Sequence, residues 1–116
     1  MRRPADQERV YLDAVLATYT SLPGTPNQPS RRDRQLARDL CRRGVPLRTV
    51  RTALLLATAR RTLRSGQPLP PVRTLHYFLP AIDEVLELPP DPEYVDYLAA
   101  KLKPFASQKT ALLGER

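Results

Sequence analysis

His76 and Cys41 are the only histidine and the only cysteine of this 116-residue chain, so they are the first candidates for acid–base or nucleophilic chemistry. A nucleophilic thiol needs a base within hydrogen-bond reach, yet the two residues fall on different predicted helices, with no glycine-rich phosphate loop nearby. His76 follows Leu75 and precedes Tyr77 and Phe78, which is typical of a core or interfacial histidine. Cys41 lies on the apolar side of its helix, where we expect a small buried side chain. The sequence predicts no catalytic residue, and we do not expect an enzyme.

Six acidic residues and no basic residue occupy positions 83–96, which we call the acidic region. Carboxylates in this number can hold a metal ion or form an acid–base pair, but these are spread over two predicted helices and a loop without the spacing of a metal-binding loop. We therefore expect no metal and no cofactor. Solvated helix faces and helix caps account for most of these residues. Asp83, Glu84 and Glu87 are equally suited to neutralise arginines of the same molecule or of a second copy.

Residues 31–73, which we call the Arg-rich region, carry twelve arginines against two aspartates and so a net charge of +10, within a total of +7 for the chain. Sixteen of the 19 basic residues are arginine. The planar guanidinium group fits phosphate oxygens and guanine edges better than the lysine ammonium group does. Nucleic acid, most simply DNA, is therefore the first partner to consider. A GC-rich genome also encodes arginine wherever a solvated cation is needed, so the excess of arginine over lysine fits both interpretations.

Length and composition limit the class of protein. A chain of 116 residues forms one domain, and its 41% apolar residues fill one modest core that must be mostly aliphatic because aromatic residues make up 6%. No run of about 18 apolar residues is present, so we expect no membrane partner. The N-terminus lacks the apolar centre of a signal peptide, and a single cysteine cannot form an internal disulfide. We expect a cytoplasmic protein.

The hydrophobic pattern predicts an all-α fold, a compact bundle of about five helices joined by Pro-rich loops. The first helix begins near Pro4. The second begins at Arg31, after a capping box of Ser30 and Asp33, and ends at residue 43 or 44. The third begins almost at once, around residues 45–47 with Pro46 in its first turn, and is apolar nearly all round at residues 53–57, which indicates a central, buried helix.

The remaining elements are interrupted by prolines. Residues 72–79 and 81–87 are expected to form two helices separated by a kink at Pro80. The last helix begins at Pro92, after the capping residue Asp91, and is expected to end at Pro104. The sequence thus predicts a single helical domain at residues 1–103 and a weakly ordered tail at residues 104–116.

Leu40 lies four positions before the turn residue Gly44, and Val50 lies six positions after it. These are the positions that lock two helices together in a helix-turn-helix, which residues 39–54 resemble. The start of the helix that follows Gly44 would offer arginines and threonines to base edges. The helix that precedes Gly44, together with the turn, would contact phosphates. Three more arginines lie at the end of the helix that follows Gly44, where cations also compensate the helix dipole. The predicted nucleic-acid-binding residues are Arg31, Arg32, Arg42, Arg43, Arg48, Thr49, Arg51, Thr52, Arg60, Arg61 and Arg64.

Residues 31–88 contain a long helical run at positions 50–61, a Gly/Pro-containing linker, the aromatic pair Tyr77 and Phe78, and a helix around Ile82. This arrangement resembles the C-terminal helical domain of DnaD-type replication proteins, in which a tyrosine-centred short helix follows a long one. The resemblance implies an accessory role in DNA replication or recombination of bacterial or mobile-element DNA. It also implies an ATPase of these processes as a partner.

Two hypotheses of different classes follow. The first is a small basic DNA-binding accessory protein that tracks the phosphate backbone, on duplex or single-stranded DNA, with limited reading of sequence. The alternative is a non-enzymatic adaptor for protein interactions, or a homodimer, in which the Arg-rich region of one molecule meets the acidic region of another.

Overall fold

The computed structural model describes residues 4–67 and 69–114, with the backbone alone at residue 4 and at residues 107–114. Within this part of the chain there are five α-helices, one short 3-10 helix (η1) and no strand, so the predicted all-α fold is confirmed. No helix of the described residues is long and apolar enough to cross a membrane. The elements are α1 (Pro4–Ser21), α2 (Arg31–Arg42), α3 (Leu47–Thr62), η1 (Leu75–Phe78), α4 (Leu79–Glu87) and α5 (Pro92–Gly114).

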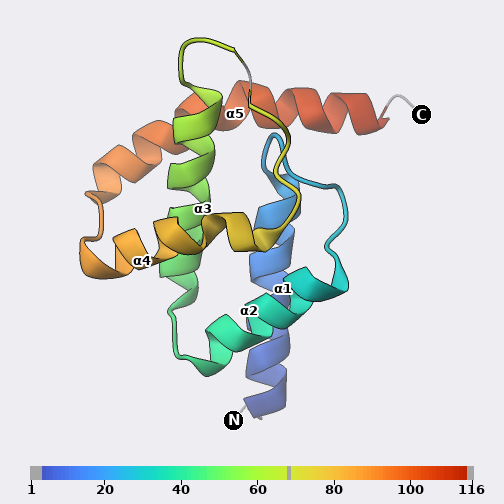
Figure 1. Ribbon diagram of the computed structural model, residues 1–116, viewed down its shortest axis with the longest axis vertical. Helices are drawn as coiled ribbons and strands as arrows, with labels where there is room; N and C mark the ends of the chain where they lie inside the picture. Colours follow the sequence, from blue (N-terminus) through green and yellow to red (C-terminus); the bar gives the residue numbers. More distant parts are fainter. Residues whose placement is uncertain (1–3, 68, 115–116) are drawn as a thin grey trace.

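Helix α3 is the centre of the bundle, as the sequence predicts. It contacts α1, α4, α5 and η1, and Figure 1 shows it in green, running through the middle of the molecule. Val50, Ala53 and Leu54 are fully buried on one side of α3, and Leu56 and Ala59 are buried on another. An apolar helix that is covered on several sides needs neighbours on each of them, which is why the other helices gather around α3.

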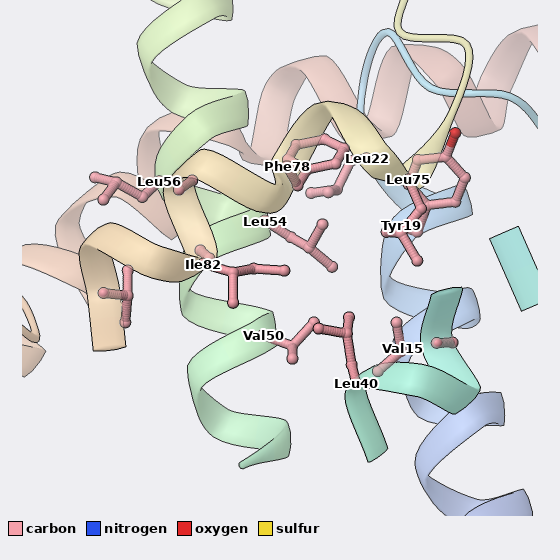
Figure 2. Packing of buried hydrophobic residues seen from close by; sticks show 14 of the residues in the cluster. Val15, Tyr19, Leu22, Leu40, Val50, Leu54, Leu56, Leu75, Phe78 and Ile82 are labelled. Carbon is pink, nitrogen blue, oxygen red and sulfur yellow. The ribbon is translucent and has the colours of Figure 1, made fainter. Parts of the chain in front are cut away.

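The core is mostly aliphatic, as the composition predicts, with two aromatic rings at its middle. Figure 2 shows Tyr19 of α1 and Phe78 of η1 beside Leu54 of α3. The rings of Tyr19 and Phe78 meet edge to face with centroids 6.0 Å apart, an arrangement that aromatic pairs prefer. Leu40 of α2 and Ile82 of α4 complete this cluster, so every segment of residues 15–85 that forms a helix contributes to one core.

The N-terminus of α2 is held by the predicted capping box. The Ser30 hydroxyl accepts a hydrogen bond from the Asp33 N–H at 3.1 Å, and the Ser30 N–H donates to Asp33 Oδ2 at 2.9 Å. Asp33 is also fully buried, and its Oδ1 accepts a hydrogen bond from the Leu75 N–H at 2.9 Å. One carboxylate therefore caps α2 and fastens η1 to it across 42 positions of sequence.

The predictions for residues 72–80 are wrong in two respects. Only Leu75–Phe78 are helical before α4, and they form a 3-10 helix. Val72 instead donates its N–H to Gly24 O at 2.7 Å, which holds the preceding segment against the first loop, and the Thr74 hydroxyl caps η1 by accepting from the His76 N–H at 3.0 Å. Pro80 lies in the first turn of α4, where a missing N–H leaves no bond unmade, so no kink occurs there.

The predicted end of the last helix at Pro104 is also wrong, because α5 continues through this proline to Gly114. A proline inside a helix removes one backbone hydrogen bond and crowds the preceding turn, which commonly bends the helix. In Figure 1, α5 changes direction between its orange and red parts without breaking. Leu98 and Leu102 are buried, and Phe105, just past the proline, lines a groove together with Thr62 at the end of α3. Residues 115–116 of the predicted tail lie outside the described part.

The buried carboxylate of Asp33 gives a first prediction. Replacing it by alanine (Asp33→Ala) leaves the Ser30 and Leu75 N–H groups without their acceptor, and we expect the free energy of unfolding to fall by roughly 2–4 kcal/mol. The matched control is Asp39→Ala on the same helix, whose exposed carboxylate accepts a hydrogen bond only from Gln35 and whose removal we expect to change stability by less than about 0.5 kcal/mol. Urea unfolding followed by circular dichroism measures both, and equal effects would contradict this role of Asp33.

Candidate nucleic-acid interface

The turn between α2 and α3 has a fixed backbone conformation. Gly44 has φ +77°, and its N–H donates to Cys41 O at 3.0 Å, while the Val45 N–H donates to Leu40 O at 3.1 Å. These two bonds are those of a Schellman motif, which ends a helix at a left-handed residue. Val45 is buried, so the chain enters α3 at Leu47 with little freedom. The turn therefore sets the angle at which α2 and α3 present their arginines.

The two residues predicted to lock a helix-turn-helix are both in the core. Leu40 and Val50 are each 0% exposed, and Figure 2 shows them close together below the aromatic pair. The Tyr11 hydroxyl of α1 donates a hydrogen bond to Val45 O at 2.8 Å, so a third helix holds the turn from outside. The local geometry of residues 39–54 thus has the rigidity that a DNA-binding helix pair needs, since its side chains must be positioned before the DNA arrives.

Most of the predicted nucleic-acid-binding side chains are accessible. Arg61, Thr49 and Thr52 are partly buried. The others are exposed, namely Arg31, Arg32, Arg42, Arg43, Arg48, Arg51, Arg60 and Arg64. Exposure alone does not make an arginine available to DNA, because several of these guanidinium groups already have partners within the chain.

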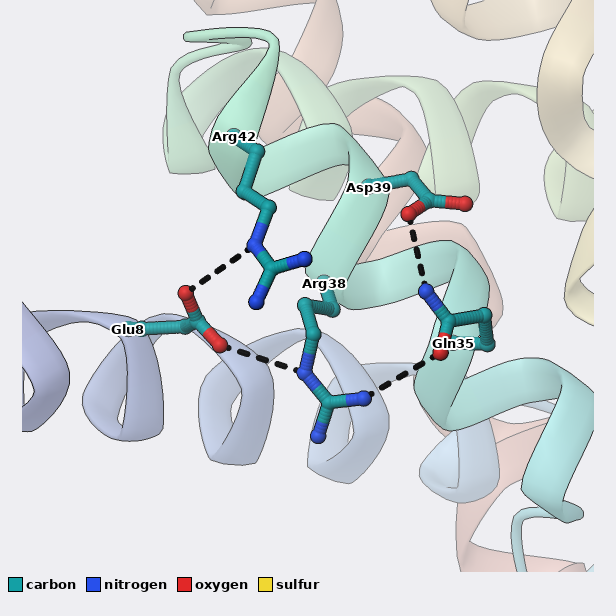
Figure 3. Close-up of polar contacts among 5 residues, drawn as sticks. All are labelled: Glu8, Gln35, Arg38, Asp39 and Arg42. Atoms are coloured by element: carbon teal, nitrogen blue, oxygen red, sulfur yellow. Dashed lines mark hydrogen bonds and ion pairs between the residues drawn. The ribbon is translucent and has the colours of Figure 1, made fainter.

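Glu8 of α1 engages the middle of α2. Its Oε1 lies 3.1 Å from Arg38 Nε and its Oε2 lies 3.6 Å from Arg42 Nε, so one carboxylate stands between two guanidinium groups (Figure 3). Arg38 also donates to Gln35 Oε1 at 3.2 Å. Arg42, a predicted phosphate contact, is therefore partly neutralised inside the molecule, and Arg38, which the sequence did not single out, has a structural partner of its own.

The three arginines at the end of α3 are likewise engaged. Arg60 Nη1 lies 2.8 Å from Glu84 Oε2 on α4. Arg61 donates to the Pro70 carbonyl and lies over the ring of Tyr77, with Cζ 5.2 Å from its centroid, and Arg64 donates to the Gln67 carbonyl at 3.1 Å. They line a groove of about 470 Å³ between α3 and α4. Their contacts hold α4 and the loop after α3, and α3 separates them from the α2–α3 turn by roughly 20 Å.

Besides Arg9 and Arg73, six exposed arginines, all on α2, in the α2–α3 turn or at the start of α3, have neither an ion pair nor a side-chain hydrogen bond among the described residues. We call them the unpaired arginine set: Arg31, Arg32, Arg34, Arg43, Arg48 and Arg51. Five of them belong to the sequence-based set. Arg34 is new, and its position three residues after Arg31, on the same side of α2, is the signal that could have identified it. On α3, Arg48 and Arg51 are also three residues apart and share one side of the helix.

Thr49 and Thr52 do not face open solvent. They line a groove of about 390 Å³ whose other wall is formed by Pro89 and Pro90 of the connection between α4 and α5 and by Val95 of α5. Arg48 is the third residue of α3 that lines this groove. The start of α3 is thus partly covered on its threonine side, and this leaves Arg48 and Arg51 as its accessible groups for contact with a nucleic acid.

Neither candidate for chemistry gains a partner in the fold. His76 is exposed, because η1 buries Leu75 and Phe78 instead, so the core alternative is wrong and the interfacial alternative stays a prediction. Cys41 is half-buried and lies near Tyr11, so it is less enclosed than predicted. Among the described residues no group of three or more histidine, cysteine, aspartate or glutamate side chains is placed to hold a metal ion.

The sequence matches no protein-family model, and comparison with curated proteins and with solved structures gives no match. The resemblance to the DnaD-type helical domain therefore stays a prediction that rests on the residues named above. The function is therefore inferred from the geometry and the charge of the molecule itself.

The tether between α1 and the turn gives a prediction about pH. Burial raises the pKa of the Tyr11 hydroxyl from 10.0 to about 12, and the nearby Cys41 thiol adds to this. Because the folded pKa lies above the unfolded one, the neutral hydroxyl stabilises the fold fully below pH 10 and loses this effect as the pH rises through about 12. The difference in unfolding free energy between the natural chain and Tyr11→Phe should therefore shrink over this interval. A difference that stays constant with pH would contradict the assignment.

Proposed function

We propose that this protein is a small, non-enzymatic DNA-binding module that holds the phosphate backbone with the unpaired arginine set. The observation that carries the proposal is the contrast within the Arg-rich region. Acidic residues and carbonyl groups of the chain engage Arg42, Arg60, Arg61 and Arg64, whereas six exposed arginines of α2, the turn and the start of α3 have no such partner among the described residues. Phosphate oxygens are the natural acceptors for guanidinium groups that lack an internal carboxylate.

The dimensions of α2 suit a phosphate backbone. Its 12 residues extend over roughly 18 Å, and at about 3.4 Å of duplex axis per base pair this length equals the axial rise of roughly five base pairs. Arg31, Arg32 and Arg34 lie at one end of α2, and Arg43 follows its other end. Arg48 and Arg51 follow on the first turns of α3. Binding that relies on such contacts depends strongly on salt and weakly on base sequence.

Direct reading of bases is limited in this proposal. The two threonines that a recognition helix would offer to base edges are partly covered by the connection between α4 and α5. Arg48 and Arg51 remain, and they suit guanine edges as well as phosphates. The resemblance to DnaD-type domains adds a setting, an accessory role in DNA replication or recombination in the cytoplasm with an ATPase as protein partner.

The test compares two pairs of arginines with equal charge. We expect Arg31→Ala/Arg34→Ala, which removes two unpaired guanidinium groups, to lower the slope of log affinity against log salt by about 1.8 on duplex DNA, because each phosphate neutralised by the protein contributes about 0.9 to this slope. The control Arg60→Ala/Arg64→Ala removes the same charge from side chains that already have internal partners, and we expect its slope to match that of the natural chain. Fluorescence anisotropy between about 50 and 200 mM salt gives the slopes.

Parallel titrations with labelled single-stranded DNA show which form of DNA the surface prefers. Failure of the natural chain to bind either form at about 50 mM salt would refute the proposal, since phosphate contacts are strongest at low salt. Equal slopes for both double variants would remove Arg31 and Arg34 from the contact surface.

A further inference from the structure

The groove at the start of α3 brings opposite charges to one edge of the molecule. Arg48 lies on its α3 wall and Asp96 on its α5 wall. Between them the lining is largely apolar and comes from the end of α4 and the start of α5, through Val85, Pro89, Pro90, Pro92 and Val95. No ion pair joins the two walls among the described residues, so both charged groups are available to a molecule that enters the groove.

Asp96 belongs to the acidic region, most of whose side chains have no ion pair within the described residues. Within the acidic region, Glu84 is paired with Arg60 and Asp91 caps α5 through the Glu93 N–H at 2.9 Å. The other acidic side chains, Asp83, Glu87, Glu93 and Asp96, are exposed and have no ion pair in the described part of the chain. The basic side continues from Arg48 to Arg51 and Arg43.

An exposed leucine lies next to the groove. Leu88 directly follows the last residue of α4 and directly precedes Pro89 of the groove wall, and at 79% it is the most exposed large apolar side chain of the described residues. The chain thus presents an exposed apolar side chain beside a largely apolar groove, with Asp96 on one wall of the groove and Arg48 on the other. Apolar groups at the centre and charges at the rim are the usual arrangement of a protein interface.

We propose that this edge is a two-fold interface between two copies of the chain, in which Leu88 of each copy enters the groove of the other and Arg48 of each copy pairs with Asp96 of the other. A two-fold axis applies every contact twice, so a surface can bind itself only if its two flanks complement each other. Here the two walls of the groove carry opposite charges, and the exposed leucine and the groove lie side by side. A wholly acidic edge would instead repel its copy.

Sedimentation velocity of the full chain without nucleic acid tests the interface. We expect a dimer at low salt that dissociates as salt rises, because its rim is made of ion pairs. Leu88→Asp should weaken the dimer at least tenfold, while Val10→Asp, the same kind of change at an exposed position on α1, should leave it intact. A natural chain that stays monomeric at low salt, or that forms open-ended oligomers, would overturn the proposal.

Charge exchange tests the pairing itself. Arg48→Glu and Asp96→Arg should each prevent self-association when alone, because each places like charges opposite one another twice. Mixed in equal amounts, the two variants should form a heterodimer, because one contact is then reversed and the other is native. Two variants that remain monomeric in the mixture, or that dimerise as well as the natural chain when alone, would refute the assigned pair.

These measurements are independent of the proposed function. They contain no DNA, and the test of DNA binding uses Arg31 and Arg34, which lie outside the groove. Arg48 belongs to both surfaces, and in the dimer it pairs with Asp96, so a dimer would hold DNA through the other five arginines of the unpaired set. Failure of one proposal therefore leaves the other standing.

Discussion

The placement of α2 in the bundle depends on the hydrogen bonds that the buried Asp33 carboxylate accepts. This carboxylate is 0% exposed and accepts hydrogen bonds from the N–H groups of Ser30 and Leu75, which belong to segments that are far apart in the chain. A buried carboxylate is costly unless such donors replace its water. Two amide groups do so here, and they join the start of α2 to η1, directly beside Phe78 and Tyr19 at the middle of the core. The same contact that caps one helix thus orients it against the rest of the bundle.

This arrangement separates arginines that hold the fold from arginines that remain available. Where α2 faces α1, Glu8 lies between Arg38 and Arg42, and where α3 faces α4, Glu84 pairs with Arg60. Exposed ion pairs contribute little to stability, commonly less than about 1 kcal/mol each. Their larger effect is on the distribution of charge, since they remove positive potential from two faces and leave it along the outer side of α2 and the start of α3. Among the described residues, no carboxylate of the same molecule forms an ion pair with the arginines of the proposed DNA contacts or with Arg48 of the proposed dimer.

Local signals in the sequence predicted the features that depend on neighbouring residues. The capping box of Ser30 and Asp33, the turn at Gly44 and the burial of Leu40 and Val50 all follow from spacings of a few positions, and all are present. Features set by distant contacts were missed. The bond from Val72 to Gly24 keeps residues 72–74 out of a helix, and packing of α5 on α3 carries that helix past Pro104. The pairing of Glu8 with Arg42, 34 positions apart, has no local signal, so sequence alone overestimated the number of available arginines.

The φ angle of +77° at Gly44 has a consequence for chirality. A Cβ atom added at this position would meet no heavy atom within 4 Å, so the surroundings leave room for a side chain. The cost of an L-alanine there comes from its own backbone, because L-residues disfavour this region. A D-alanine, introduced by chemical synthesis, would prefer this region, because inverting the Cα configuration inverts the preferred sign of φ. For an L side chain, the limit at position 44 is therefore the handedness of the backbone and not the space around it, and a mirror-image residue would restrict the unfolded chain to conformations that include the φ of this turn.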